Sequence, residues 1–455
     1  MKTRMNFKDE FYQKLKLLVL PIAIQNFMLA LVSATDPIML GWIDQTSLSA
    51  VSLAGQVQFV LSLFISGIAA GAGIMAAQYW GKQDAASIEK VIPIALRTNL
   101  LFSGLFTILA GFCPEMLMRI FTNDAALVAS GSQYLRAVAL SYVLCGISQV
   151  YLILLKNTGH AAVSSRISST AVVLNIILNA ILIYGLCGAP ALGIRGAAYA
   201  TVAARVVELI WAYLETKKPE RVRILWNRLF SSAGKILSED FWRYTLPVLA
   251  ASLVWGIAYV LYSVIMGHMG SDAVAANSIT SIAKSLLSCL IRGVSGGAGV
   301  LIGNLLGANE LEKAREYGGR LSHLSIAIGI VTGGLLMLIS PAIVHFAPLS
   351  DTAAEYLQYM LLFCGLNLMA QSVNTTVLDG IFCAGGDAKF DMQGNIGAMW
   401  CFSVPLGFLA AFWLKLPVMV VYCIVNLDEI VKLPAVYHHY KKYIWVRNIT
   451  RDIED

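Results

Sequence analysis

Long apolar stretches with few charges run through this chain and limit what it can fold into. A helix of about 20 apolar residues crosses the hydrocarbon core of a bilayer. Stretches of that kind recur along the 455 residues, at 17–41, 49–79, 91–113, 132–156, 163–186, 191–214, 243–268, 274–305, 319–346, 354–383, 391–413 and 416–436. The pattern predicts an all-α polytopic membrane protein with about twelve transmembrane helices.

Composition supports a lipid environment. Charged residues make up 13% of the chain and hydrophobic residues 58%, whereas roughly a quarter of a soluble domain is charged. The net charge of +6 comes mostly from short loops, so we expect the lipid bilayer, and no nucleic acid, as a partner. No small-residue cleavage site follows the first apolar stretch, which favours a retained helix over a signal peptide.

The basic residues predict the topology. Lys and Arg gather in the N-terminal tail, the central loop, the C-terminal tail and the loops after the second and eighth helices. With an even number of helices, this places both termini in the cytoplasm and the protein in the cytoplasmic (inner) membrane. We therefore expect an N-terminal six-helix lobe at 1–215, a basic cytoplasmic linker at 216–242, a C-terminal six-helix lobe at 243–437 and a cytoplasmic tail at 438–455.

The two halves repeat one another. Pro21 aligns with Pro247, an offset of 247 − 21 = 226 residues. The same offset pairs Gly41 with Gly267, Ala50 with Ala276, Ser52 with Ser278, Gly67 with Gly293, Gly71 with Gly297, Gly73 with Gly299 and Gly81 with Gly307. Because each copy has six helices, both copies have the same orientation, which predicts a parallel internal repeat of the kind that transporters use.

Asp36 is the most informative intramembrane charge. It lies near the outer end of the first helix, and a rise of 1.5 Å per residue puts it roughly 9 Å deep. Pro37 follows it, so we expect the helix to bend or open at this point. Such a carboxylate can take up a proton or a small cation. The alternative is that Asp36 lies at a capped helix end that is hydrated from the outer side of the membrane.

Three further polar residues are expected at a similar depth. Asn175 and Asn179 are four residues apart and share one face of a helix, and Thr201 lies on the next helix. With Asp36 they would form an all-oxygen set suited to Na⁺ or to a proton-linked network, with no other metal site indicated. Ordinary hydrogen bonding between helices is the alternative.

The remaining polar residues are less informative. Lys284 and Arg292 share a helix face, Asp379 lies near a helix end, and the set Asp428, Glu429 and Lys432 is interpreted as solvated. Amide side chains that would line a substrate cavity, or join helices, are Gln56, Gln58, Gln149, Gln371 and Asn374. No HExxH or CxxC pattern occurs, and we predict neither an enzyme nor a resident cofactor.

Several motifs, in order, resemble those of the MATE (multidrug and toxic compound extrusion) family. Asp36 to Gly41 is similar to the family's D-x-I-x-x-G pattern, and Leu48 to Ala54 to its LSAVSLA stretch. GAGIMAAQYWGK (71–82) and its repeat GAGVLIGNLLGA (297–308) resemble GxGxxxAQxxGxx. AGGDAKF (384–390) is similar to GGDT(R/K)F, and the segments LN…LIYG and RGAAYAT also match.

The resemblance implies two six-helix lobes around a central cavity. It implies efflux of amphipathic, often cationic compounds in exchange for H⁺ or Na⁺. Asp36, Asn175, Asn179 and Thr201 would correspond to the family's cation site, although prototypes of one branch carry an aspartate at the place of Asn179. Trp255 and Ser372 stand where NorM-type members have C-lobe carboxylates, so coupling is expected in the first lobe.

Three other functions would each require a feature of their own. A lipid-linked precursor flippase would want a large, strongly basic cavity, and Lys284 and Arg292 alone fall short of one. A membrane-embedded lipid enzyme would need clustered histidines or paired acidic motifs. An ATP-driven pump would need a nucleotide-binding domain. We expect small organic substrates and no obligate protein partner.

Overall fold

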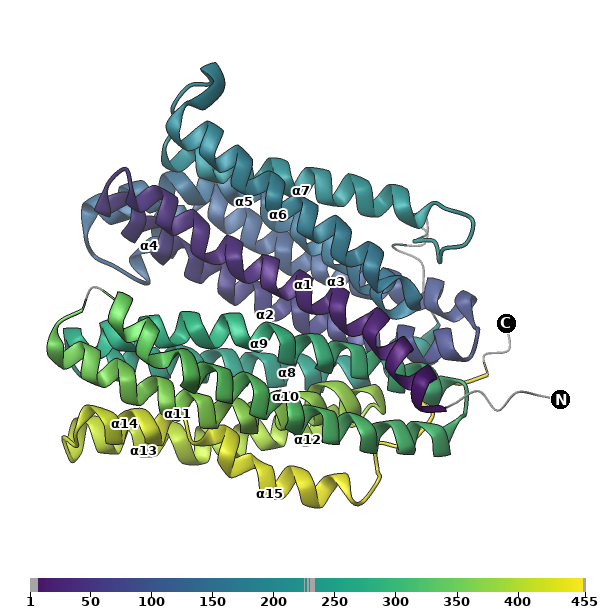
Figure 1. Ribbon diagram of the computed structural model, residues 1–455. Coiled ribbons are helices and arrows are strands. Elements are labelled where there is room, and N and C mark those ends of the chain that lie inside the picture. The colour runs from purple at the N-terminus through teal and green to yellow at the C-terminus, as the bar shows by residue number, and fades with distance from the viewer. Residues whose placement is uncertain (1–6, 225, 227–228, 230–233, 348, 453–455) are drawn as a thin grey trace. The chain divides into compact units, whose positions relative to one another are not determined.

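The computed structural model describes residues 7–224, 226, 229, 234–347 and 349–452; the side chains of residues 7–9, 34, 36 and 37 lie outside the description. The described residues form helices and no strands (Figure 1). The helices of the first half are α1 (Phe7–Gly41), α2 (Gln45–Gly81), α3 (Ala85–Phe112), the short α4 (Pro114–Arg119), α5 (Ala125–Leu155), α6 (Ala161–Tyr184) and α7 (Ile194–Thr216). Those of the second half are α8 (Lys235–Gly267), α9 (Ser271–Gly307), α10 (Leu311–Phe346), α11 (Asp351–Thr375), α12 (Ala388–Asn395), α13 (Val404–Phe408), α14 (Val418–Val425) and α15 (Asp428–Tyr440).

Short segments of tighter or wider helix connect some of these elements. They are the π-helical η1 (Lys156–His160), η4 (Thr376–Phe382), η5 (Ile396–Ser403) and η6 (Leu409–Trp413), and the 3₁₀ turn η2 (Leu186–Gly188). Ten helical stretches of the described chain are long and apolar enough to cross a membrane. One of them, Ala125–Tyr184, contains both α5 and α6, which Gly159 separates with a φ of +81°. Together with the pair α14 and α15 this gives the twelve predicted helices.

One expectation about a single helix was wrong. The helix predicted at 416–436 is interrupted at Asn426 and Leu427, between α14 and α15. Asn426 departs from helical geometry, with φ −102° and ψ 11°, and its side chain donates to the Tyr422 carbonyl at 3.0 Å, a local bond that competes with the helix ladder. Helix α1 does not open at Pro37 but continues to Gly41, and a bend at Pro37 stays a prediction.

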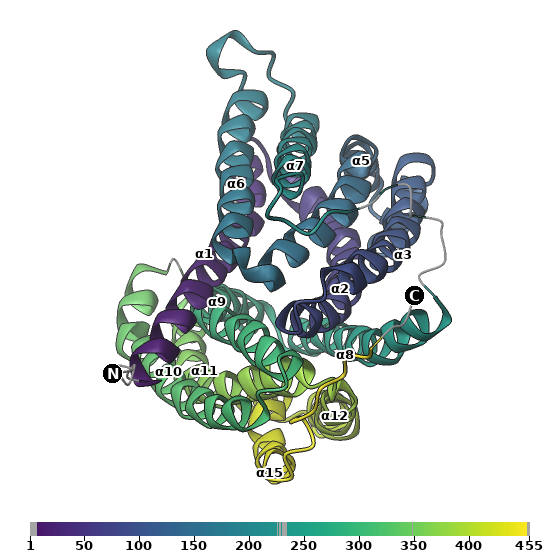
Figure 2. The ribbon, with the colours of Figure 1, turned by 90° about the vertical axis from the view of Figure 1, so that its right-hand side faces the viewer.

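The chain forms two compact units, and the division falls within α1 and α8. One unit comprises residues 24–249, here called the 24–249 unit, and the other comprises residues 1–23 and 250–452, here called the 250–452 unit. In the 24–249 unit α5 packs against α2, α3 and α7, and α6 packs against α7. Figure 2 shows the helices of this unit nearly end-on. The lobe boundaries expected from helix order remain a prediction.

Glycines on α2 allow close packing against the first part of α8. A Cβ atom added to Gly71 would lie 2.3 Å from Thr245 Oγ1, and one added to Gly67 would lie 2.9 Å from Leu249 Cα. Both contacts belong to the 24–249 unit. The helix backbones therefore approach one another more closely than any larger residue permits.

The 250–452 unit repeats this packing with the first part of α1. A Cβ atom on Gly293 of α9 would lie 2.9 Å from Ala23 Cα, and one on Gly297 would lie 2.8 Å from Val19 Cγ2. The predicted offset that relates Gly67 to Gly293 and Gly71 to Gly297 also relates their contacts, Ala23 to Leu249 and Val19 to Thr245. The repeat thus holds in three dimensions as well as in sequence.

Candidate ion and substrate site in the 24–249 unit

A cavity of about 480 Å³ lies within the 24–249 unit. Helices α1 and α2 line it with apolar side chains, among them Leu29, Val51 and Phe59, and with the polar side chains of several serines and glutamines. Helices α6 and α7 contribute Asn175 and Thr201. The lining thus mixes apolar and polar side chains, and the volume of the cavity falls in the range of small-molecule sites.

Polar side chains of α6 and α7 form a chain of hydrogen bonds at the cavity. Asn179 Nδ2 donates to Asn175 Oδ1 at 3.3 Å, and Asn175 Nδ2 donates to Thr201 Oγ1 at 3.2 Å. The Thr201 hydroxyl donates in turn to the Ala197 carbonyl at 3.0 Å. Both asparagines are buried, and they meet because one α-helical turn separates them. The structure therefore brings together three of the four residues predicted for a cation site.

Asp36, the fourth residue, is placed by its backbone alone, because its side chain lies outside the described part. Position 36 follows Val32 and Ser33, two cavity-lining residues of α1, by four and three residues. Positions three and four apart lie on the same helix face. The helical register therefore puts position 36 on the face of α1 that borders the cavity.

An ion pair at the cavity was missed in the sequence. Arg205 Nη1 donates to both carboxylate oxygens of Glu208 at 3.0 Å, and Ser148 Oγ donates to Glu208 Oε1 at 2.6 Å. Glu208 is buried, and both charged residues line the cavity. Their spacing of three residues inside a predicted transmembrane helix is a signal that could have identified the pair.

The amides predicted for a substrate cavity separate into two groups. Gln56 and Gln58 line the cavity of the 24–249 unit. Gln149 is half-buried on α5 and is not among the residues that line it. Gln371 and Asn374 lie on α11 in the 250–452 unit, where Asn374 Nδ2 donates to the Glu429 carbonyl at 2.6 Å and to Glu429 Oε2 at 2.8 Å.

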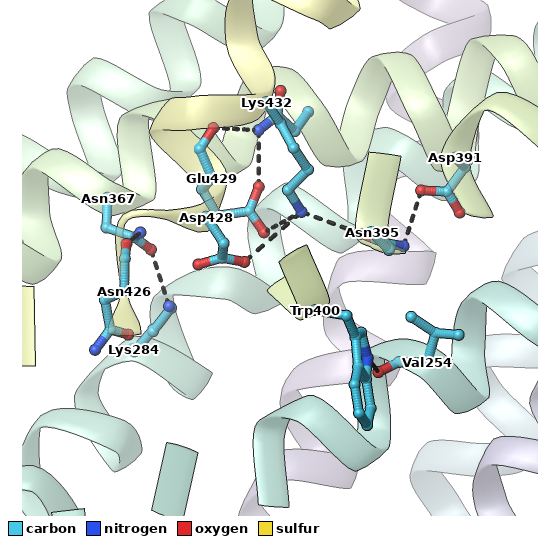
Figure 3. Close-up of polar contacts among 11 residues, drawn as sticks. Val254, Lys284, Asn367, Asp391, Asn395, Trp400, Asn426, Asp428, Glu429 and Lys432 are labelled. Carbon is cyan, nitrogen blue, oxygen red and sulfur yellow. Dashed lines mark hydrogen bonds and ion pairs between the residues drawn. The ribbon is translucent and has the colours of Figure 1, made fainter. Parts of the chain in front are cut away.

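The interpretation of Asp428, Glu429 and Lys432 as a solvated set was wrong. Their exposed fractions are 5%, 9% and 6%, because the break between α14 and α15 turns all three into the 250–452 unit. There Lys432 contacts both carboxylates and Asn395 (Figure 3).

Three other charged residues of this unit differ in their surroundings. Lys284 Nζ donates to Asn367 Oδ1 at 2.9 Å, and Asn367 Nδ2 donates to the Asn426 carbonyl at 2.6 Å. Lys284 thus orients the amide that satisfies the backbone at the break before α15. Arg292 and Asp379 have exposed side chains that lie within electrostatic range of each other.

The ten membrane-length helical stretches of the described residues define a multi-pass membrane protein. The model of the MatE family matches the chain twice, at residues 21–181 and 247–409. The two matches begin at the aligned prolines and cover more than half of the sequence, so the chain belongs to the MatE family of multidrug efflux transporters and is not an enzyme.

Individual relatives are similar in sequence to this chain over nearly its whole length. The "Uncharacterized transporter YisQ" of Bacillus subtilis is 21% identical over 94% of this chain and 93% of its own. The "Probable multidrug resistance protein YoeA" of the same organism is 21% identical over 99% and 98%. A solved MOP superfamily transporter from Pyrococcus furiosus, 20% identical, has the same fold with a TM-score of 0.85 over 95% of both chains.

Proposed function

We propose that this protein exports amphipathic, often cationic compounds in exchange for H⁺ or Na⁺, by alternating access. Asp36, Asn175, Asn179 and Thr201 are assigned to the coupling ion, and the adjoining cavity to the substrate. Ion binding would have to differ in affinity between the inward-open and outward-open states for it to drive transport.

The observation that carries the proposal is the meeting of a polar chain with a cavity. Asn179, Asn175 and Thr201 are joined by hydrogen bonds, and the last two also line the cavity. An ion at position 36 and a substrate in the cavity would therefore share side chains. That sharing gives a direct route by which one ligand alters the affinity for the other.

The lining of the cavity suits an amphipathic substrate. Leu29, Val51 and Phe59 offer apolar contacts, while Gln56 and Gln58 offer amide donors and acceptors. Aromatic rings such as that of Phe59 attract organic cations through their π-electron face. The chemistry thus favours small organic compounds with an apolar body and a polar or cationic group.

The charge of the cavity does not favour a lipid-linked precursor as cargo. Arg205 is the basic residue among those that line the cavity, and the neighbouring Glu208 carboxylate pairs with it. A pyrophosphate headgroup would require surplus positive charge. The lining carries none in its described residues.

We also propose that the protein resides in the cytoplasmic membrane with both termini in the cytoplasm. The support is the excess of Lys and Arg in the tails and the central loop, since cytoplasmic segments of membrane proteins are enriched in these residues.

Transport by the full-length chain in liposomes tests the assignment. A fluorescent organic cation would be followed while a pH gradient and a Na⁺ gradient are imposed separately. We expect one gradient to drive accumulation in the wild type and that response to be lost in Asp36→Asn. Glu115→Gln, which changes an exposed carboxylate of the same unit, serves as the control and should behave as wild type.

Two results would contradict the proposal. If Asp36→Asn responded to the gradient as well as the control did, the coupling site would be wrong. If the wild type ignored both gradients with several organic cations, ion-coupled export itself would be refuted.

A further inference from the structure

Buried carboxylates outnumber cations in one cluster of the 250–452 unit, far in sequence from the proposed coupling site. Asp391 on α12 and Asp428 and Glu429 on α15 have exposed fractions of 6%, 5% and 9%. Lys432, 6% exposed, is the cation that contacts Asp428 and Glu429 (Figure 3). With all four ionised, three negative charges and one positive charge leave a formal charge of −2 in a membrane-spanning unit.

The Lys432 ammonium lies between the two carboxylates of α15. Its Nζ atom is 3.3 Å from Glu429 Oε1 and 3.7 Å from Asp428 Oδ2, and it donates to Asn395 Oδ1 at 3.1 Å. A tethered cation therefore already occupies the place that a metal ion would take between these carboxylates. No group of three His, Cys, Asp or Glu side chains suited to a metal ion occurs among the described residues.

Asp391 has no ion pair of its own in the described contacts. Its Oδ1 atom accepts from Asn395 Nδ2 at 3.1 Å, and the same Asn395 accepts from Lys432 through its Oδ1 atom. The lysine therefore reaches Asp391 only through an amide. A buried carboxylate without a direct cation carries a large desolvation penalty, which uptake of a proton removes.

The other titratable and charged groups around Asp391 do not neutralise it. Asp379 and Cys383 lie within its electrostatic range, and Glu429 adds a further negative charge. Lys284 lies within range of Asp428 and Glu429 but donates to Asn367, and Arg292 lies within range of Asp379. The Tyr262 hydroxyl of α8 lies within range of Asp428 and Glu429.

An unpaired acceptor beside Glu429 independently indicates a missing hydrogen-bond donor at the cluster. Asn374 is 1% exposed, and both hydrogen bonds from its Nδ2 atom go to Glu429, which fixes the orientation of the amide. Its Oδ1 atom then has no donor among the described residues. A protonated carboxyl or a water molecule would supply that donor, whereas a bare carboxylate cannot.

The backbone around the cluster is discontinuous in two places. The carboxylates of Asp428 and Glu429 begin α15 directly after the break, and the π-helical η5 follows directly after Asn395. Interrupted helices and π-helical turns recur at ion and substrate sites of membrane proteins. Both interruptions lie directly beside residues of this cluster, one beside Asp428 and the other beside Asn395.

We propose that the cluster around Lys432 reversibly binds a proton at Asp391, making a second ion site in the 250–452 unit. One oxygen of the Asp391 carboxylate gains a proton from water, and the formal charge of the cluster changes from −2 to −1. The site goes beyond the proposed function, which assigns the coupling ion to the 24–249 unit.

Infrared difference spectroscopy of the full-length protein in liposomes tests this assignment without measuring transport. Spectra would be compared between about pH 6 and about pH 9, where exposed Asp and Glu stay ionised. We expect the wild type to gain a carboxylic acid C=O band at the lower pH. Asp391→Asn should lose the intensity of one carboxylic acid, and Glu355→Gln, an exposed carboxylate change in the same unit, should lose none.

Two further variants keep the outcomes distinct. Lys432→Gln removes the cation and should add intensity, since the α15 carboxylates then also take up a proton. An unchanged band in Lys432→Gln, an unchanged band in Asp391→Asn, or no band in the wild type would each overturn the inference. A band that disappears in Asp36→Asn but persists in Asp391→Asn would overturn it while leaving the proposed function intact.

Discussion

The close packing of α2 against α8 makes a sharp prediction for Gly71→Ala. The new Cβ atom would lie 2.3 Å from Thr245 Oγ1 and 2.7 Å from Thr245 Cα. Carbon atoms in contact are normally about 3.5–4.0 Å apart, so the two helices must separate by roughly 1 Å. Overpacking of this kind costs about 1–3 kcal/mol.

The helix propensity of alanine acts in the opposite direction. Replacing a helical glycine by alanine favours folding by up to about 1 kcal/mol. Gly55→Ala on the same helix provides the matched control, because its Cβ would meet no atom within 4 Å. The difference in unfolding free energy between the two variants therefore isolates the overpacking cost.

Thermal unfolding in detergent, followed by intrinsic fluorescence, measures this difference. With an unfolding entropy that scales with chain length, about 1–3 kcal/mol corresponds to roughly 1–3 °C for a chain of this size. The melting temperature of Gly71→Ala should be lower than that of Gly55→Ala by about that amount. Gly297→Ala should fall between them, because its nearest contact is the Cγ2 atom of Val19, a side-chain atom that can move. A melting temperature of Gly71→Ala equal to or higher than that of Gly55→Ala would refute the packing argument.

Two smaller predictions concern the polar chain and a helix cap. Thr201→Val removes the hydroxyl that accepts from Asn175. If the proposed site is right, it should weaken the gradient response in liposomes by roughly 5- to 150-fold, as about 1–3 kcal/mol of lost or unsatisfied hydrogen bonding implies, while expression and folding stay normal. Asp44→Ala removes the N-cap of α2 and should lower stability at neutral pH by about 1 kcal/mol. Hydrogen bonds from the Ser47 hydroxyl and amide lower the pKa of Asp44. Its contribution is therefore present above the unfolded-state value of about 3.9 and is lost as the pH falls through the lower folded-state value. The gap between wild type and variant in a pH series of thermal scans should accordingly close in acid, and a gap that widens there would contradict the cap.

The helices were predictable because the thickness of the bilayer requires apolar stretches of about 20 residues, and stretches of that length stand out in the hydropathy of the sequence. The repeat was predictable because glycines at contacts such as Gly71 and Gly297 tolerate no larger side chain. The adjacency of Asn175 to Asn179 followed from helical periodicity alone. Their hydrogen bond to Thr201 on α7 also needed the two helices to meet at the right register, which the sequence could only suggest.

The burial of Asp428, Glu429 and Lys432 could not be predicted from the sequence, and the reason is physical. Asp428, Glu429 and Lys432 near a helix end look like an exposed charge set, as such sets usually are. Their burial depends on the break at Asn426, and the break depends on distant partners, since Asn367 must satisfy the freed carbonyl. A local pattern carries no information on a contact made 59 residues away.

Substrate-driven ion movement is the most direct test of ion-coupled export. Liposomes containing the full-length protein and an internal pH or Na⁺ indicator would receive an organic cation from outside, with no ion gradient imposed. The proposal predicts that entry of the organic cation drives H⁺ or Na⁺ out of the vesicle, and that Asp36→Asn uncouples the two movements. Entry of the organic cation through the wild type with neither ion moving would contradict it.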